Sequence, residues 1–178
     1  MRIISGTHKG KQIFPDKNFK ARPTTDFAKE NLFNVLNNYI DIESIRALDL
    51  FSGTGSISYE LASRGAEKII SIEANYNHFS FIKRTAQQLG FKNMTVYKTD
   101  AFIACKKLKG QNFDLIFADP PYDLPNIIEI PAAIFDNDLL SPDGIAVIEH
   151  PATVDFSAFP CFLEHRQYGS VNFSIFRK

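Results

Sequence analysis

Five short apolar runs recur along the chain between residues 45 and 149. They cover residues 45–50, 68–73, 93–97, 114–118 and 145–149. Continuous runs of this length, rich in isoleucine, leucine and valine, are typical of strands buried on both faces of a parallel sheet. Segments with helical spacing lie between the first four runs, so the pattern predicts an α/β fold in which strands and helices alternate.

Helices are predicted between these strands and ahead of the first one. They cover residues 25–36, 57–63, 76–89 and 102–108. In the first of them, Thr24 or Thr25 can act as N-cap. The residues expected on its apolar face are Phe27, Leu32, Phe33, Val35 and Leu36. Lys29 and Glu30 are expected on or beside the opposite face.

The last third of the chain carries turn residues. Pro125 and Pro131 are expected to interrupt helical turns within residues 123–140, and residues 141–144 read as a turn. Two further strands, 162–168 and 171–177, are predicted to form a terminal hairpin around Gly169 and Ser170. We therefore expect the fold to end in an antiparallel pair.

The N-terminal segment differs in composition from the rest. The first thirty residues hold seven basic and three acidic side chains, although the whole chain has a formal net charge of +0. One interpretation is a basic arm or hairpin over residues 1–24 that holds RNA phosphates through Lys9, Lys11 and Arg22. The alternative is a solvated charged segment without a ligand. Residues 25–178 are expected to form one globular unit.

The composition limits the class of protein. With 178 residues, 44% of them hydrophobic and 22% charged, the chain fits one globular domain with a proper core. No apolar run approaches about 20 residues, and no signal-peptide pattern opens the chain, so we expect a cytoplasmic protein with no membrane partner. Cys105 and Cys161 lack metal-ligand spacing, so we expect reduced thiols and no metal site. A monomer is expected at this size.

The most informative motif is Asp119-Pro120-Pro121-Tyr122, directly after the fourth strand. Two prolines end a strand and stiffen the loop at the sheet edge where open α/β folds bind ligands. The Asp119 carboxylate and the Pro120 carbonyl can accept both N–H bonds of an aromatic amine and hold them out of the ring plane. The nitrogen lone pair is then free, and Tyr122 can stack on the ring. The alternative is a rigid turn with a surface tyrosine.

A glycine loop, Phe51-Ser52-Gly53-Thr54-Gly55-Ser56, follows Asp49 at the end of the first strand. Gly53 and Gly55 let the backbone approach a ligand closely. Enzymes that bind dinucleotides prefer G-x-G-x-x-G at this point. Ser58 stands where that pattern has its third glycine, which weakens an NAD-binding interpretation.

Polar residues follow the next strand ends as well. Glu73 comes about twenty residues after the loop, where an acid can accept ribose hydroxyls, or it is an exposed acid at a strand end. Asp100, followed by Ala101, can accept a hydrogen bond from the amine of adenine, or act as N-cap of the next helix. His150 is expected to be an edge histidine without a chemical role.

The order of these motifs resembles the class I S-adenosylmethionine-dependent methyltransferases. Four segments resemble more narrowly the bacterial 16S ribosomal RNA guanine-N2 methyltransferases. They are M-R-I-I-S-G at 1–6, R-P-T-T-D-x-x-K-E-x-L-F-N at 22–34, L-A-S-R-G-A at 61–66 and F-A-D-P-P-Y at 117–122. The D-P-P-Y motif alone is shared with adenine-N6, cytosine-N4 and glutamine methyltransferases.

The resemblance implies a Rossmann-like, mostly parallel seven-stranded sheet with helices on both faces and an antiparallel last strand. It implies S-adenosylmethionine over residues 49–55 and methylation of a guanine N2 amine in 16S ribosomal RNA, naked or within the 30S particle. It assigns cofactor binding to Asp49, Glu73 and Asp100, and catalysis to the loop 119–122. Two alternatives remain: another amino methyltransferase, acting on DNA adenine or protein glutamine, and a non-catalytic ribosome-assembly factor.

Overall fold

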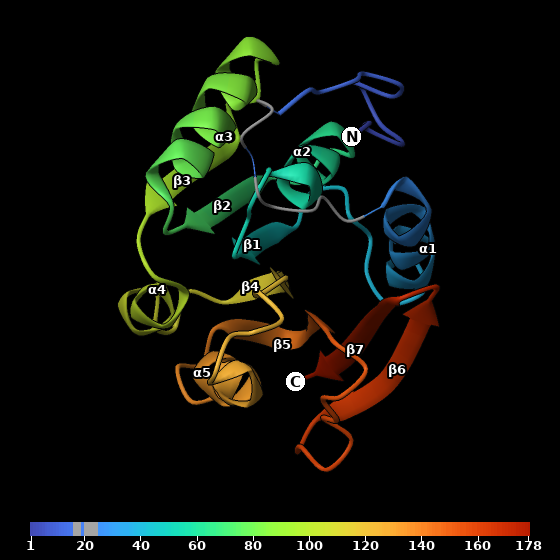
Figure 1. Cartoon of the computed structure of the whole chain (residues 1–178), viewed down its shortest axis with the longest axis vertical. Helices are drawn as coiled ribbons and strands as arrows, with labels where there is room; N and C mark the ends of the chain where they lie inside the picture. The colour runs from blue at the N-terminus through green and yellow to red at the C-terminus, as the bar shows by residue number, and fades with distance from the viewer. Residues whose placement is uncertain (16–18, 20–24) are drawn as a thin grey trace.

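The computed structural model describes residues 1–15, 19 and 25–178, and Figure 1 shows the chain. Within these residues seven strands form one sheet in the order β3-β2-β1-β4-β5-β7-β6. The strands are β1 Arg46–Leu50, β2 Lys68–Glu73, β3 Met94–Lys98, β4 Phe113–Ala118, β5 Leu140–His150, β6 Phe162–Tyr168 and β7 Val171–Arg177. Strands β1 to β5 pair in parallel, whereas β7 runs antiparallel to both β5 and β6. The predicted sheet, including its antiparallel last strand, is confirmed.

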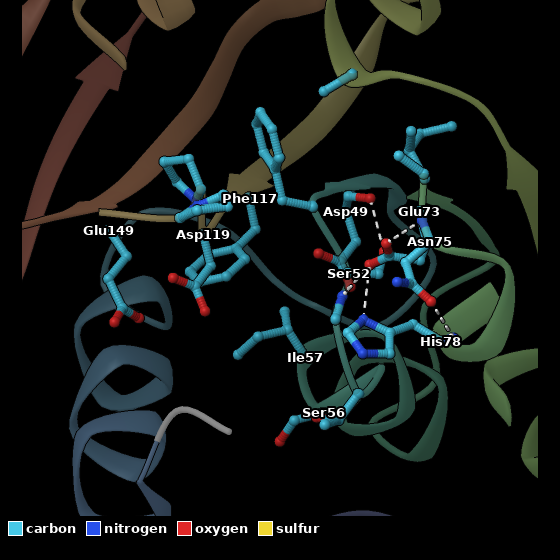
Figure 2. Close-up of a pocket in the computed structure, with 18 of the residues that line it drawn as sticks. Asp49, Ser52, Ser56, Ile57, Glu73, Asn75, His78, Phe117, Asp119 and Glu149 are labelled. Carbon is cyan, nitrogen blue, oxygen red and sulfur yellow. Dashed lines mark hydrogen bonds and ion pairs between the residues drawn. The ribbon is translucent and has the colours of Figure 1, made fainter. Parts of the chain in front are cut away.

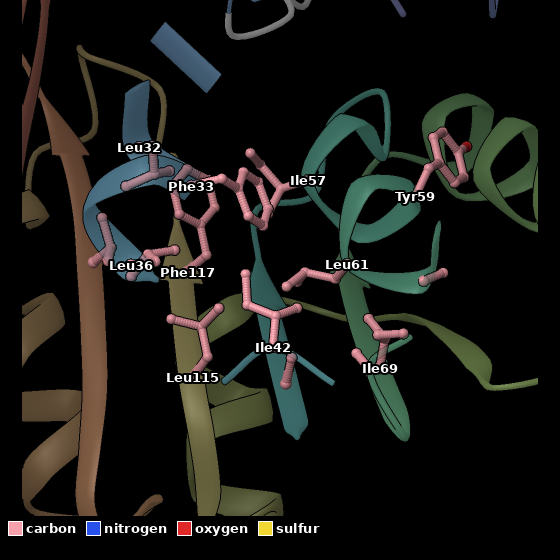
Figure 3. Close-up of a cluster of buried hydrophobic side chains, with 14 of the residues drawn as sticks. Leu32, Phe33, Leu36, Ile42, Ile57, Tyr59, Leu61, Ile69, Leu115 and Phe117 are labelled. Carbon is pink, nitrogen blue, oxygen red and sulfur yellow. The ribbon is translucent and has the colours of Figure 1, made fainter. Parts of the chain in front are cut away.

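Helices cover both faces of the sheet. They are α1 Asp26–Leu36, α2 Ser56–Ser63, α3 Tyr76–Gln88, α4 Ala101–Lys107, the 3-10 turn η1 Ile127–Glu129 and α5 Ile130–Phe135. Alternate residues of β1 enter two separate cores: Ala47 packs with α1, α2 and α3, whereas Leu48 packs with α4 and α5. Figure 3 shows part of the first core, with Leu115 and Phe117 of β4 beneath Leu32 of α1.

The strand order reverses between β1 and β4. From β1 the chain builds the sheet outward through β2 to β3, and from β4 it builds in the other direction through β5. Such a switch leaves a crevice at the carboxyl ends of the two central strands, because their following loops turn to opposite sides. In this chain those loops are the glycine loop and the D-P-P-Y loop.

The N-terminal segment lies against α2. Ile3 and Ile13 are buried, and the Ile3 N–H donates to the Lys11 carbonyl at 3.0 Å. Arg2 and Gln12 form an antiparallel bridge, so the chain folds back on itself between these residues. The segment therefore contributes side chains to the main core rather than standing apart from it.

The buried face of α1 differs from the predicted one. Thr25 is the N-cap, as predicted, and accepts from the Ala28 N–H at 3.1 Å. Phe27, however, is 64% exposed, whereas Lys29 is only 1% exposed. Lys29 is buried because its ammonium group donates to the Arg2 carbonyl at 2.6 Å and lies 3.6 Å from the Glu60 carboxylate, so its charge has partners inside the protein.

Three expectations for the C-terminal third are corrected. Residues 141–144, expected as a separate turn, are an irregularity within β5, where Leu140 pairs with Phe113 and the next paired residue is Ile145. Pro131 lies in the first turn of α5, where a missing N–H is tolerated, and does not break that helix. His150 is buried rather than at an edge, because β5 lies between β4 and β7, and its ring bonds the Ser174 hydroxyl at 2.8 Å.

Other expectations for this part of the chain hold. The hairpin over residues 162–168 and 171–177 is confirmed. Both cysteines are free thiols, Cys105 buried and Cys161 exposed. No helix among the described residues combines the length and the apolar character needed to cross a membrane.

Candidate active site

A cavity of about 840 Å³ opens where the carboxyl ends of β1, β2, β4 and β5 meet. Its lining comes from both loops at the switch point, from the acids that follow β2 and β3, and from Glu149 on β5 (Figure 2). Thr25 at the start of α1 and Ser170 in the turn between β6 and β7 complete the wall. The size is that of a small-molecule or cofactor site.

The glycine loop is shaped by left-handed backbone. Phe51, Gly53 and Gly55 have φ angles of 60°, 54° and 78°. A Cβ atom at Gly55 would lie 2.7 Å from the ring of Tyr59, so this position requires glycine for space as well as for conformation. Gly53 lines the cavity, whereas Gly55, predicted as a cofactor contact, faces Tyr59 and is not part of the lining.

Asp49 lies behind this loop and is almost fully buried. Its carboxylate accepts from the Ser58 hydroxyl, which also lies 2.7 Å from the Ser71 hydroxyl. Burial raises the pKa of Asp49 to about 7, although the bonds from Ser58 and Ser52 act in the opposite direction. Ser58 thus has a specific polar partner at the position where a dinucleotide-binding loop has glycine. The predicted role of Asp49 toward a cofactor stays a prediction.

Glu73 fixes the loop to the end of β2. One carboxylate oxygen accepts from the Gly53 N–H at 2.8 Å, and the other accepts from the Asn75 N–H at 2.7 Å. His78 lies 3.8 Å from the same carboxylate. Glu73 is buried in the cavity wall and is not the exposed acid of the alternative interpretation. Each oxygen can accept a further hydrogen bond from a ligand.

Asp100 has a structural role that the sequence left as an alternative. Its carboxylate accepts from the Ile103 N–H at 3.1 Å and so caps α4, confirming the N-cap interpretation. Asp100 and Ala101 also line the cavity, together with Phe51. The capping bond leaves the second carboxylate oxygen for other partners, so a contact with a ligand is compatible with the cap.

The D-P-P-Y loop forms the opposite side of the cavity. Asp119, Pro120, Pro121 and Tyr122 all line it. Tyr122 is 47% exposed, and its hydroxyl donates to the Glu149 carboxylate at 3.1 Å. Burial, followed by the charges of Glu149 and Asp49, raises the pKa of Asp119 well above its usual range. The same surroundings raise the pKa of Tyr122, so its hydroxyl stays protonated.

Glu149 is the site residue that the sequence interpretation missed. Its strand neighbour Ile148 pairs with Ala118, which places Glu149 beside Asp119 at the same edge of the sheet. Figure 2 shows both carboxylates directed toward one side of the cavity. The only indication in the sequence was an acid ending a buried strand, which has no meaning until the order of the strands is known.

The basic residues assigned to RNA lie away from the cavity. Lys9 and Lys11 are exposed and do not line it, and Arg22 lies outside the described residues. Among the described residues no three histidine, cysteine, aspartate or glutamate side chains gather as a metal site. The lining is therefore dominated by carboxylates, backbone groups and aromatic or aliphatic side chains.

Comparison with known proteins assigns the chain to a family. Residues 1–177 match the family described as "Conserved hypothetical protein 95". The chain belongs to this family. YlbH from Bacillus subtilis (strain 168) is 35% identical over 160 residues, which cover 87% of this chain and 85% of YlbH. The protein named ribosomal RNA small subunit methyltransferase D from Buchnera aphidicola (subspecies Baizongia pistaciae, strain Bp) is 30% identical over 155 residues, 87% of this chain and 78% of that protein.

The fold agrees with a solved structure of similar size. The structure of yhhF from Escherichia coli superimposes with a TM-score of 0.85 at 26% sequence identity, covering 100% of this chain and 97% of yhhF. The family resemblance stated from the sequence motifs and the Rossmann-like methyltransferase fold are both confirmed. Of the residues that the motifs assign to cofactor binding and catalysis, all but Gly55 line the cavity.

Proposed function

We propose that this protein transfers a methyl group from S-adenosylmethionine to the exocyclic N2 amine of a guanine in 16S ribosomal RNA. The observation that carries the proposal is the convergence, in one cavity, of the glycine loop with Asp119, Pro120 and Tyr122. The relative named ribosomal RNA small subunit methyltransferase D supports the choice of RNA and of the small subunit. The base and the atom rest on the D-P-P-Y chemistry and on the sequence resemblance.

The residues on the β1 and β2 side fit S-adenosylmethionine. Gly53 lines the cavity without a side chain, so a ligand can approach the loop backbone there. Glu73 can accept ribose hydroxyls, and Asp100 can accept from the adenine amine, because both retain free acceptor capacity. When bound, the cofactor supplies a methyl group carried on a positively charged sulfur.

The residues on the β4 side would hold the acceptor amine. The Asp119 carboxylate and the Pro120 carbonyl accept the two N2 hydrogens, so the nitrogen lone pair is directed out of the guanine plane. Tyr122 stacks on the base, a contact that contributes roughly 1–3 kcal/mol in comparable sites. Holding two reacting groups in this way can remove on the order of 7–11 kcal/mol of barrier in the best cases.

Asp119 is also suited to take a proton. When N2 gains the methyl group it carries a positive charge and must lose one hydrogen. The raised pKa of Asp119, caused by burial and by Glu149, makes its carboxylate a stronger base than an ordinary aspartate. The proton therefore moves along the hydrogen bond that already holds the amine.

A guanine within folded RNA must leave its helix to reach this cavity, because the reacting atoms lie at the sheet edge between two loops. Lys9, Lys11 and Arg22 are proposed to hold phosphates of the surrounding RNA; Lys9 and Lys11 lie away from the cavity that takes the nucleotide. Unstacking costs a few kcal/mol, which phosphate contacts and stacking on Tyr122 offset.

The test is methyl transfer from labelled S-adenosylmethionine to 30S particles and to naked 16S RNA, both from cells that lack this protein, followed by nucleoside analysis. Label in N2-methylguanosine supports the proposal. The substrate that is methylated faster shows whether the protein recognises RNA alone or the assembled particle. Asp119→Ala should bind the cofactor and lose turnover. Label in N6-methyladenosine, or none despite cofactor binding, would refute the guanine assignment; absence of cofactor binding would favour an assembly factor.

A further inference from the structure

The acceptor side of the cavity contains a second carboxylate, to which the mechanism above assigns no contact with the substrate. Glu149 is 6% exposed, yet it lines the cavity beside the D-P-P-Y loop. The parallel pairing of Ala118 with Ile148 makes Asp119 and Glu149 the first residues beyond the paired ends of adjacent strands. The Tyr122 hydroxyl donates to Glu149 at 3.1 Å, which links this acid to the stacking residue.

The negative charge of Glu149 raises the pKa of Asp119. Only burial has a larger effect on that pKa. Two carboxylates that face the same space favour a ligand that supplies hydrogen-bond donors to both of them. A ligand with several adjacent N–H groups meets that requirement.

Guanine has such a set of donors. Its N2 amine carries two hydrogens and the neighbouring N1 carries a third, all on one edge of the ring. Adenine and cytosine instead place an unprotonated acceptor nitrogen next to their exocyclic amine. A carboxylate beside the amine-binding group therefore attracts guanine and repels the other two bases, which provides selection against wrong substrates as well as for the right one.

We propose that Glu149 selects guanine by accepting the N1–H while Asp119 and the Pro120 carbonyl hold the N2 amine. This inference rests on the proposed function. It assigns base choice to a residue outside the D-P-P-Y motif, which by itself only binds an amine. The Tyr122 ring stacks on the base, and its hydroxyl donates to the same acid.

The experiment combines a change of one side chain with a change of the base. The target guanine is first mapped with the wild-type protein, and the same RNA is then prepared with 2-aminopurine at that position. This base keeps the 2-amine but has an acceptor at N1 and no oxygen at C6, so the comparison between protein variants isolates the part of the preference that depends on Glu149. The wild-type protein should prefer guanine by roughly 10- to 100-fold in kcat/KM, the usual effect of a hydrogen bond to a charged group. Glu149→Gln, whose amide can donate to the N1 acceptor, should reduce that preference at least tenfold.

Two control variants separate base selection from general damage. Glu164 is also a strand carboxylate that accepts from a tyrosine hydroxyl, here Tyr39 at 2.8 Å, but it lies outside the cavity lining. Glu164→Gln should leave the preference for guanine unchanged. Tyr122→Phe removes the hydroxyl and keeps Glu149, so it should slow both substrates with a similar ratio between them.

Equilibrium binding of the two RNAs, measured with S-adenosylhomocysteine present, gives the same comparison without turnover if Glu149→Gln is slow. If Glu149→Gln prefers guanine as strongly as the wild type does, both by rate and by binding, the proposed role of Glu149 is wrong, while the proposed function is unaffected. Failure of the wild-type protein to methylate any guanine would instead refute the proposed function, and the inference with it.

Discussion

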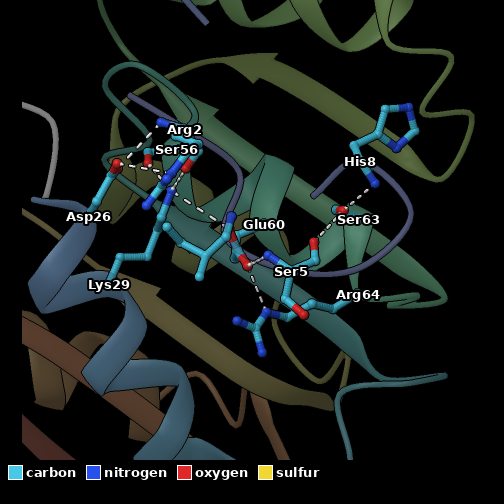
Figure 4. Close-up of polar contacts among 10 residues, drawn as sticks. Arg2, Ser5, His8, Asp26, Lys29, Ser56, Glu60, Ser63 and Arg64 are labelled. Atoms are coloured by element: carbon cyan, nitrogen blue, oxygen red, sulfur yellow. Dashed lines mark hydrogen bonds and ion pairs between the residues drawn. The ribbon is translucent and has the colours of Figure 1, made fainter. Parts of the chain in front are cut away.

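Glu60 should stabilise the fold more than its buried partner Lys29 does. Glu60 is 0% exposed and accepts from the backbone N–H groups of Ile4 and Ser5 at 2.7 and 3.0 Å. It also accepts from Arg64 at 2.8 Å and lies 3.6 Å from the Lys29 ammonium (Figure 4). One carboxylate therefore joins the N-terminal segment, α1 and α2, whereas Lys29 adds one of four donors.

The expected loss of unfolding free energy depends on which interactions remain after each substitution. Lys29→Met keeps three donors on Glu60 and loses bonds from Lys29 to the Arg2 carbonyl and the Ser56 hydroxyl, about 1 kcal/mol each. Part of this loss is recovered, because desolvation outweighs the attraction of Glu60 and lowers the pKa of Lys29. We expect a net cost of about 1–2 kcal/mol. Glu60→Gln leaves a buried cation without its carboxylate and should cost about 3–5 kcal/mol.

Urea unfolding at pH 7 measures both variants, with circular dichroism as the probe because the chain has no tryptophan. The dependence of the unfolding free energy on urea should stay constant, so that shifts of the midpoint report stability. Asp26→Asn, which removes the partner of Arg2 in an exposed pair at 3.6 Å, is the control and should cost less than about 1 kcal/mol. A Lys29→Met variant as unstable as Glu60→Gln would refute the reasoning.

Three further predictions concern charge. Burial raises the pKa of Asp49 to about 7, so the wild type loses stability as pH rises from about 4 to 7. The unfolding free energy of Asp49→Asn relative to that of the wild type should therefore rise by roughly 2–3 kcal/mol between pH 5 and 8 in urea titrations, and a constant difference would contradict this. Because Glu149 raises the pKa of Asp119, kcat/KM on guanine RNA should fall with decreasing pH at an apparent pKa above the ordinary carboxyl range. In Glu149→Gln this apparent pKa should move to lower pH. If it does not move, the fall in kcat/KM is due to another group. Replacing Lys9 and Lys11 by glutamine should reduce the slope of log affinity against log salt by about 1.4–1.8, and an unaltered slope would remove both residues from the RNA interface.

Local patterns were sufficient to predict the strands and the loops at their ends. The run at 68–73 becomes β2 with the same bounds, and the terminal hairpin is likewise found as predicted. The local sequence determines these elements well. A parallel strand that is buried on both faces must be apolar throughout, and the two prolines and the glycine loop mark the ends of β4 and β1. The places of Asp119 and Gly53 in the cavity follow directly, since parallel strands present their carboxyl ends at one edge.

Long-range partners could not be predicted from local patterns. A lysine between apolar residues of a helix reads as solvent-exposed, and Lys29 is buried only because Glu60, on another helix, supplies its counter-charge. Phe27 is apolar and is therefore predicted to lie in the core, but its ring lies on the surface and makes an edge contact with Tyr168. Glu149 acquires its role from the pairing of β5 with β4, which no residue of either strand indicates alone.

The charge distribution constrains how a nucleic acid would approach the site. Five carboxyl groups line the cavity, namely Asp49, Glu73, Asp100, Asp119 and Glu149, and its described lining includes no lysine or arginine. Such a cavity attracts a sulfonium cofactor and amine hydrogens but repels phosphate. An RNA substrate must therefore enter with its base first and leave its backbone outside the cavity. A formal net charge of +0 is compatible with the proposed RNA binding, because the carboxyl groups are concentrated in the cavity while exposed lysines such as Lys9 and Lys11 lie away from it.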